Sequence, residues 1–243
     1  MPNLLFHPRY PKILLAIFLL YAAAWSIHPT DVKDWALENA LTVLALLFLI
    51  LTHKRLPLSN ISYTAIFIFL CLHTIGSHYT YSLVPYNDWT RALLGRSLND
   101  ILGWQRNNFD RIVHFCFGLL LAYPIRELFL RVAGAKGFWG YYLPLDVTIS
   151  FSALYELIEW AAAVIFGAEL GAAYVGAQGD PWDAQKDMAL ATLGAVICIA
   201  CVALINWKFD RNFGAELRDS LTVKPDVGPL GEQKLRDLIN HVP

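Results

Sequence analysis

The sequence predicts an all-α fold, a polytopic membrane protein whose six transmembrane helices form one bundle. Hydrophobic residues make up 56% of the 243 residues, and the mean hydropathy is +0.44. Charged residues make up only 16%, whereas a soluble domain usually has about 25%. The apolar residues are also gathered in long runs, each close to the length that a helix needs to cross a bilayer.

Six apolar runs define the predicted spans. A helix rises about 1.5 Å per residue, so about 20 residues cross the hydrocarbon core. Lys12, Lys33 and Glu38 lie near the edges of the first two runs, where long side chains can reach the polar interface. The first run also resembles a signal peptide, and we interpret it as an uncleaved anchor. The predicted spans are residues 11–27, 36–52, 61–83, 110–130, 145–167 and 187–207.

These spans predict one transmembrane domain over residues 1–207 and a short polar tail over 208–243. Lys and Arg are enriched in the cytoplasmic loops of membrane proteins. With both termini inside, 13 of the 19 Lys and Arg residues fall on the cytoplasmic side and the other six outside. We therefore predict that both termini and the tail are cytoplasmic. Leu235, Leu238 and Ile239 predict a short helix in the tail.

The loop 84–109 is then extracytoplasmic, and its apolar residues recur at helical spacing. Trp89 and Trp104 flank the pattern, and tryptophan favours membrane interfaces. We predict a helix over residues 91–103 that lies on the outer membrane surface, although an amphipathic helix packed on the bundle would show the same pattern. The apolar residues of the pattern are Leu94, Leu98, Ile101 and Leu102.

Ionisable residues interrupt the later spans, and such residues inside a membrane are costly and usually functional. Asp110 and His114 are four residues apart, so they share one helical face. Asp183 and Asp187 have the same spacing. In the predicted topology these groups fall in the outer half of the bundle. The candidate site residues are His73, His78, Asp110, Arg111, His114, Glu156, Glu159, Asp180, Asp183 and Asp187.

Three interpretations of this cluster stay open. Imidazole and carboxylate together suit a divalent metal such as zinc or manganese. The same groups suit a relay of protons or ions through a water-filled cavity. In a purely structural cluster, Arg111 pairs with nearby carboxylates and His114 is hydrogen-bonded within the bundle. The candidate metal ligands are His73, Asp110, His114 and Asp187.

Glu156 and Glu159 are the candidate catalytic residues, because a carboxylate beside an activated water can act as a general base. Asp183 also suits an N-cap of the last span, since its carboxylate can accept from free backbone N–H groups. The other polar site residues are His78, Arg111, Asp180 and Asp183.

The sequence contains no motif for nucleic-acid binding, for a phosphate-binding loop or for catalysis by a Ser or Cys nucleophile. The net charge of −1 gives no field that would attract nucleic acid, and the sequence shows no Gly-rich phosphate loop and no nucleophilic Ser or Cys motif. Cys198 and Cys201 have redox spacing, but they lie deep in an apolar run and are interpreted as packing residues. The expected partners are membrane lipid and a lipid-linked substrate, without nucleic acid.

Four segments carry a family resemblance, namely residues 73–81 (HTIGSHYTY), 107–115 (NNFDRIVHF), 155–160 (YELIEW) and 178–188 (QGDPWDAQKDM). They resemble the YjdF-like family of predicted bacterial inner-membrane proteins, whose function is unknown. The resemblance covers about residues 35–207 and implies a location in the bacterial inner membrane. Asp110-Arg-x-x-His-Phe and the later Asp183-x-x-x-Asp187 more distantly resemble the VanZ-like family, which is associated with resistance to glycopeptide antibiotics.

The function predicted from these observations is that of an inner-membrane protein with an outward-facing polar, metal-binding site. As an enzyme it would carry out metal-assisted hydrolysis or transfer on a lipid or lipid-linked envelope substrate. Two alternatives stay open, a small proton- or ion-coupled transporter and a non-catalytic envelope assembly or scaffold protein. The sequence does not decide whether the protein is an enzyme.

Overall fold

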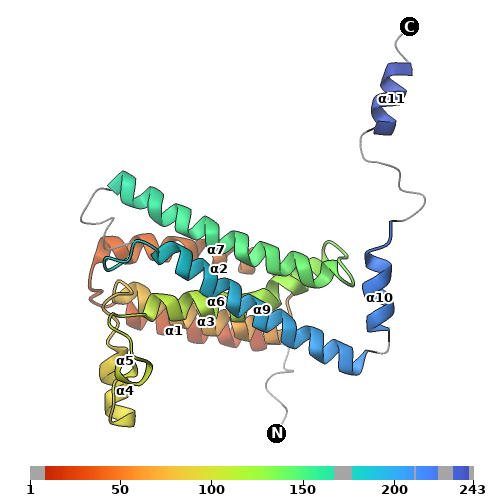
Figure 1. Cartoon of the computed structure of the whole chain (residues 1–243). Coiled ribbons are helices and arrows are strands. Elements are labelled where there is room, and N and C mark those ends of the chain that lie inside the picture. Colours follow the sequence, from red (N-terminus) through yellow and green to blue (C-terminus); the bar gives the residue numbers. More distant parts are fainter. Residues whose placement is uncertain (1–8, 167–176, 211, 224–231, 241–243) are drawn as a thin grey trace.

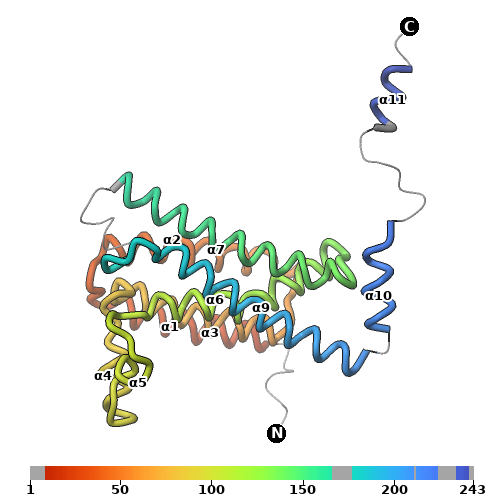
Figure 2. The backbone as a smooth tube through the Cα atoms, viewed as in Figure 1, coloured from red at the N-terminus to blue at the C-terminus, as the bar shows by residue number. Residues whose placement is uncertain are grey.

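The structure is a computed structural model, and it describes residues 9–166, 177–210, 212–223 and 232–240. Every regular element in these residues is a helix, and the long helices lie side by side in one bundle (Figures 1 and 2). The helices are α1 (Tyr10–Trp25), α2 (Val32–Thr52), α3 (Asn60–His78), α4 (Tyr86–Leu94), α5 (Leu98–Leu102), α6 (Phe109–Arg131), α7 (Trp139–Phe166), α9 (Asp183–Phe209), α10 (Phe213–Ser220) and α11 (Glu232–Asn240).

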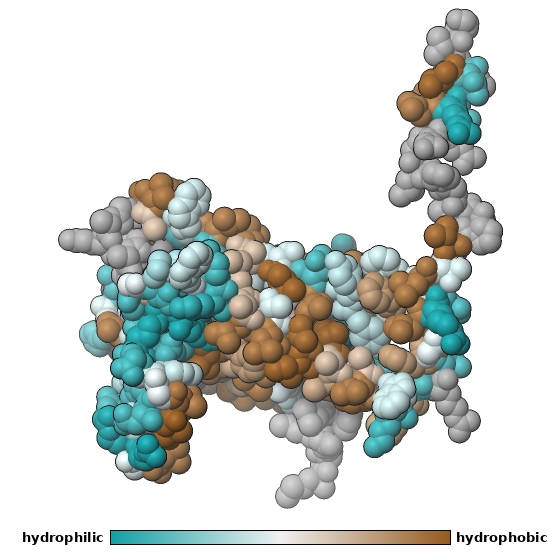
Figure 3. Space-filling model, viewed as in Figure 1, coloured by the Kyte–Doolittle hydropathy of each residue, from teal (hydrophilic) through white to brown (hydrophobic). Residues whose placement is uncertain are grey.

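Five helices of the described chain, α2, α3, α6, α7 and α9, are long and apolar enough to cross a membrane. Apolar surface occupies the middle of the bundle, and hydrophilic surface gathers toward its ends (Figure 3). The prediction of a polytopic helical membrane protein is therefore confirmed. Helix α1 has 16 residues and rises about 24 Å, less than the roughly 30 Å of a hydrocarbon core, so the count of six spans stays a prediction.

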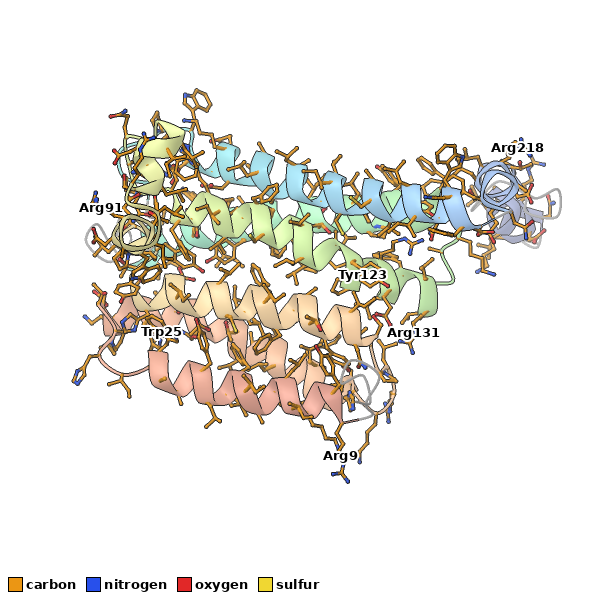
Figure 4. All side chains as sticks on the ribbon, turned by 90° about the horizontal axis from the view of Figure 1, so that it is seen from below. Arg9, Trp25, Arg91, Tyr123, Arg131 and Arg218 are labelled. Carbon is orange, nitrogen blue, oxygen red and sulfur yellow. The ribbon has the colours of Figure 1, made fainter. Side chains whose placement is uncertain are left out.

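The two ends of the bundle carry different residues. Arg9, Arg131 and Arg218 lie at one end, while Trp25 and Arg91 lie at the other (Figure 4). The predicted topology requires this separation, because it places the first three residues in the cytoplasm and Arg91 outside. The separation does not depend on which end faces the cytoplasm, so the orientation of the termini stays a prediction.

Two predicted spans differ most in their bounds from the helices of the structure. The span 61–83 ends at His78, because the chain then turns through Thr80 and Tyr81, both in the left-handed region with φ near 50°. The span 145–167 begins earlier, at Trp139, with Pro144 inside the helix. Residue 167 lies outside the described residues. The turn after His78 matters for the site, because it directs Tyr81 back onto α3.

The prediction of one helix over residues 91–103 is wrong. Two short helices, α4 and α5, occupy this loop, because Gly95 ends α4 in a left-handed conformation with φ 75°. Ser97 then caps α5 by accepting from the backbone N–H of Asp100 at 3.0 Å. The two helices form an arm that projects from the bundle (Figure 1), and one side of the arm is hydrophobic (Figure 3).

The tail contains the predicted short helix, α11, and an additional helix, α10, that the sequence analysis missed. Helix α10 is attached to the start of α7. The backbone N–H of Phe138 donates to Ser220 Oγ at 2.8 Å, and Trp139 Nε1 donates to the Ser220 carbonyl oxygen at 2.9 Å. The division of the chain after residue 207 stays a prediction.

The most extensive packing between helices is that of α6 against α9. A Cβ atom on Gly118 would collide with the Ala191 carbonyl oxygen and the Ala195 backbone nitrogen. A Cβ atom on Gly194 would collide in the same way with the backbone of α6 at Phe115. Small residues allow helix backbones to approach closely in membranes, and here the two backbones are in direct contact.

This contact continues along two matched rows of residues at four-residue spacing, which we call the α6–α9 stripe. Each row begins with polar residues at the N-terminus of its helix and continues with small residues. Because residues four apart share a helical face, the small residues hold the polar ones opposite each other. The stripe consists of Asp110, His114, Gly118 and Ala122 on α6 with Asp183, Asp187, Ala191 and Ala195 on α9.

We expect Gly118→Val to lower the thermal unfolding midpoint in mild detergent. The new side chain would force the backbones of α6 and α9 apart, and overpacking of this kind costs about 1–3 kcal/mol. Gly214→Val is the matched control, because Gly214 is also helical and nothing lies within 4 Å of its Cβ position. Equal midpoints for the two variants would show that the close approach of α6 and α9 is not needed for stability.

Candidate functional site

Three candidate ligands meet at the polar end of the α6–α9 stripe. Asp110, His114 and Asp187 each present one ligand atom, and these atoms lie within 4.8 Å of one another. The residues are 9%, 7% and 2% exposed, respectively. We call these three residues the triad. Its geometry follows from the stripe, because Asp110 and His114 occupy one face of α6 and Asp187 lies on the facing surface of α9.

Helix α7 adds a fourth group to the triad. Glu156 Oε1 lies 3.4 Å from His114 Nε2, and Asp110 Oδ1 lies 3.5 Å from the same nitrogen. Glu156 Oε1 and Asp187 Oδ1 are buried and have no hydrogen-bond partner in the described part of the chain. These unsatisfied oxygens and the imidazole are the kinds of donor that hold a divalent transition metal, so the residues present fit such an ion.

Two arginines lie beside the triad but pair with other carboxylates. Arg106 contacts Asp183 at 2.5 Å. Arg111 contacts Asp180 at 2.6 Å and Asp183 at 3.1 Å. Asp183 therefore binds two arginines. It does not occupy the predicted N-cap position, because Trp182 is the N-cap residue and Asp183 is the first residue of α9. Within the described part of the chain, neither arginine forms an ion pair with a residue of the triad.

Asp180 belongs to the loop before α9 and is tied to that helix by its neighbours. Lys186 Nζ donates to Asp180 Oδ2 at 2.5 Å, and the backbone N–H of Trp182 donates to Oδ1 at 3.1 Å. The hydrogen bond from Lys186, followed by that from Trp182, holds the pKa of the Asp180 carboxyl below its usual range. Asp180 is therefore a charged partner of Arg111 at the edge of the site.

The charge balance of the buried site is unusual. Among the described residues, Asp110, Glu156 and Asp187 form no ion pair with Lys or Arg. Buried carboxylates are costly unless they are paired, protonated or bound to a metal. Ion pairs with Arg106, Arg111 and Lys186 balance the charges of Asp180 and Asp183, but they do not include the other three carboxylates. The site therefore requires either a bound cation or bound protons.

Two acidic residues of α2 extend the cluster, and the sequence analysis missed both. Glu38 is 2% exposed, and its carboxylate accepts from Tyr155 Oη at 2.9 Å. Asp34 is 1% exposed, and neither carboxylate oxygen has a partner in the described residues. Glu159 is buried as well and lies on α7, three residues after Glu156. The four-residue spacing of Asp34 and Glu38 was the signal that could have revealed them.

The structure places His73 beside this cluster but outside the triad. His73 Nε2 lies 3.2 Å from the Glu38 carbonyl oxygen and donates to it, so Nδ1 is the acceptor for the Tyr81 hydroxyl. Both nitrogens are thus engaged. Gly76 permits this arrangement, because a Cβ atom there would overlap the ring of Tyr81. In this conformation His73 offers no free nitrogen to a metal.

The structure places His78 away from the triad, between α1 and α3. His78 Nδ1 donates to the Trp25 carbonyl oxygen at 2.7 Å, and the two rings meet edge to face with centroids 5.0 Å apart. The five-residue separation from His73 explains this, because it turns the two side chains to different faces of α3. His78 joins two helices of the bundle and takes no part in the cluster.

Comparison with known proteins agrees with the membrane architecture. Residues 10–208 match the family model described as "Predicted membrane protein (DUF2238)". The inner membrane protein YjdF of Escherichia coli (strain K12) is 34% identical over 205 residues, which cover 83% of this chain and 91% of that protein. No solved structure matches the chain. The chain belongs to the YjdF-like family of predicted membrane proteins, DUF2238.

Proposed function

We propose that this protein is a multi-pass inner-membrane enzyme that binds a divalent metal at the triad and uses it on an ester of a lipid or lipid-linked envelope substrate. One observation carries the proposal. Asp110, Glu156 and Asp187 surround His114 in a buried site and have no Lys or Arg partner among the described residues. A divalent cation would balance these charges and satisfy the free oxygen of Asp187.

The donor set favours zinc or manganese. Imidazole nitrogen suits zinc and related transition metals, whereas calcium and magnesium prefer oxygen ligands alone. The triad contains one imidazole and two carboxylates, and Glu156 adds a third carboxylate within 3.4 Å of the imidazole. His73 would play an indirect part. Its hydrogen bond to Glu38 links α3 to α2 next to the ligands, and its hydrogen bond with Tyr81 holds the turn after α3.

The chemistry that this site would support is hydrolysis or transfer at an ester. A bound ion supplies Lewis acidity and lowers the pKa of water. Glu156 Oε1 is free to accept a proton from the attacking water or hydroxyl group. The oxygen of that group bonds to the acyl or phosphoryl centre, the bond to the leaving oxygen breaks, and Glu156 returns the proton to the leaving oxygen. Glu159 would position Glu156 from the next helical turn.

A second candidate function is proton-coupled transport. The buried carboxyl groups on α2, α6, α7 and α9 favour it, because protons on them would also balance the charge. Asp34 and Glu38 support this alternative, since they continue the cluster beyond the triad. The two candidates differ in one property that can be measured, because only the first requires a metal in stoichiometric amount.

We expect the purified protein to contain about one divalent transition metal per chain and His114→Ala to lose it, because the triad then lacks its only nitrogen ligand. The measurement is elemental analysis after exchange into metal-free mild detergent. His78→Ala is the matched control, since that histidine joins α1 and α3 away from the triad. Wild-type protein without metal would eliminate the enzyme proposal and favour the relay.

We expect a metal chelator to lower the thermal unfolding midpoint of the wild type and added Zn²⁺ or Mn²⁺ to restore it. A ligand that binds only the folded state at about 100 times its Kd stabilises that state by about 2.7 kcal/mol. The double variant Asp110→Asn, Asp187→Asn keeps the shape of both side chains but should not respond to metal. A response equal to that of the wild type would place the metal elsewhere.

We propose in addition that both termini are cytoplasmic, so that the triad lies near the outer face. Alkaline phosphatase fused after residue 105 or 180 should then be active, because that enzyme requires an extracytoplasmic location. Green fluorescent protein at the C-terminus should be fluorescent as the complementary control. An active cytoplasmic reporter after residue 105 or 180 would reverse the orientation and place the triad near the inner face.

A further inference from the structure

A cavity of about 510 Å³ lies between α2, α3, α6 and α7 and ends at Asp110 and His114 of the triad. Asp110 and His114 line it at one end, together with His73 and Tyr155. Away from this end the lining is almost entirely apolar. The lining follows α6 from Asp110 to Leu128, which is about 27 Å at about 1.5 Å per residue. The cavity is therefore long and apolar, with polar groups concentrated at one end.

The cavity is open at the side of the bundle, between α2 and α7. Tyr155 and Glu38 join these helices at the polar end through their hydrogen bond. Beyond that bond, Phe48 on α2 and Phe151 and Leu154 on α7 line the cavity, yet each is about half exposed. These helices belong to the set that is long and apolar enough to cross a membrane. In a bilayer, the opening would face lipid chains.

The distribution of polar groups matches an amphiphile. The cavity volume falls within the range of about 300–1,000 Å³ that is typical of ligand sites. The apolar walls suit a hydrocarbon chain, and the carboxylate of Asp110 and the imidazoles of His73 and His114 lie only where the chain would end. A polar solute would find few partners along the walls, where the polar lining residues are Thr42, Thr52, Tyr63 and Ser152. A compact apolar solute would not need the polar end.

We propose that the cavity binds one acyl chain of a membrane phospholipid, which enters between α2 and α7. Phe69 and Phe117 pack edge to face with centroids 5.6 Å apart and form part of the wall along which the chain lies. The ester at the head of the chain then lies beside Asp110 and His114. This last placement rests on the proposed function, whereas occupation of the cavity by a chain does not.

Photocrosslinking in nanodiscs tests the inference. The discs contain phosphatidylethanolamine and phosphatidylglycerol with a trace of phosphatidylethanolamine that carries a diazirine in the middle of one acyl chain. Peptide mapping should find crosslinks on the interior lining residues Phe69, Phe117 or Leu121, in addition to lipid-facing residues such as Leu19 and Leu204. Crosslinks on lipid-facing residues alone would overturn the inference.

A pair of variants tests the route of the chain. Ala45 lines the cavity on α2, and Ala45→Trp should abolish the interior crosslinks by filling the opening. Ala40 is exposed on the same helix but does not line the cavity, so the interior crosslinks should persist in Ala40→Trp. Interior crosslinks that persist in Ala45→Trp would contradict a route between α2 and α7. The wild-type map remains decisive if a variant fails to fold.

Metal analysis of the same samples separates this inference from the proposed function. Interior crosslinks in a protein without metal would support chain binding and eliminate the metal enzyme. A stoichiometric metal without interior crosslinks would support the metal site and overturn chain binding. Both together would support a lipid ester as the substrate class.

Discussion

The site depends on the direct backbone contact between α6 and α9. Gly118 and Gly194 have no room for a Cβ atom, and Ala122, Ala191 and Ala195 are completely buried beside them. Because each row of the stripe repeats every four residues, this close approach in the middle of the helices holds their polar N-terminal residues opposite each other. The triad is thus positioned by residues that take no part in its chemistry. A wider separation of the two helices would separate its ligands.

The charge of the triad has to be balanced by something other than the arginines. Arg106 and Arg111 form their ion pairs with Asp180 and Asp183 at the end of the bundle, and among the described residues no Lys or Arg pairs with the carboxylates around His114. Removing charges from water costs several kcal/mol each, so the folded protein is stable only with a cation or with protons at this place. The same requirement underlies both candidate functions, and the identity of the bound species distinguishes them. The lateral cavity then provides the route by which a lipid would reach the triad.

Most of the fold could be predicted from apolar runs and helical spacing. The same spacing predicted that Asp110 shares a face with His114 and that Asp183 shares a face with Asp187. Three features could not be read from the chain. Helix spacing does not show that the turn after His78 brings Tyr81 back onto His73, which engages both of its nitrogens. Gly95 divides a pattern that looked continuous into α4 and α5. Asp34 and Glu38 resembled the charged edge of a span, because only tertiary packing buries them. The more distant likeness to the VanZ-like family stays a prediction.

The most direct test of the central claim is X-ray absorption spectroscopy at the metal edge of the purified protein. If the triad holds the metal, we expect a first shell of nitrogen and oxygen at about 2.0–2.2 Å, with the outer-shell scattering of one imidazole. Asp187→Asn should reduce the number of first-shell ligands, while the imidazole signal remains. A sulfur shell at about 2.3 Å would place the metal on cysteine and contradict the account. The absence of any bound metal would contradict it as well, and the buried carboxylates would then be balanced by protons.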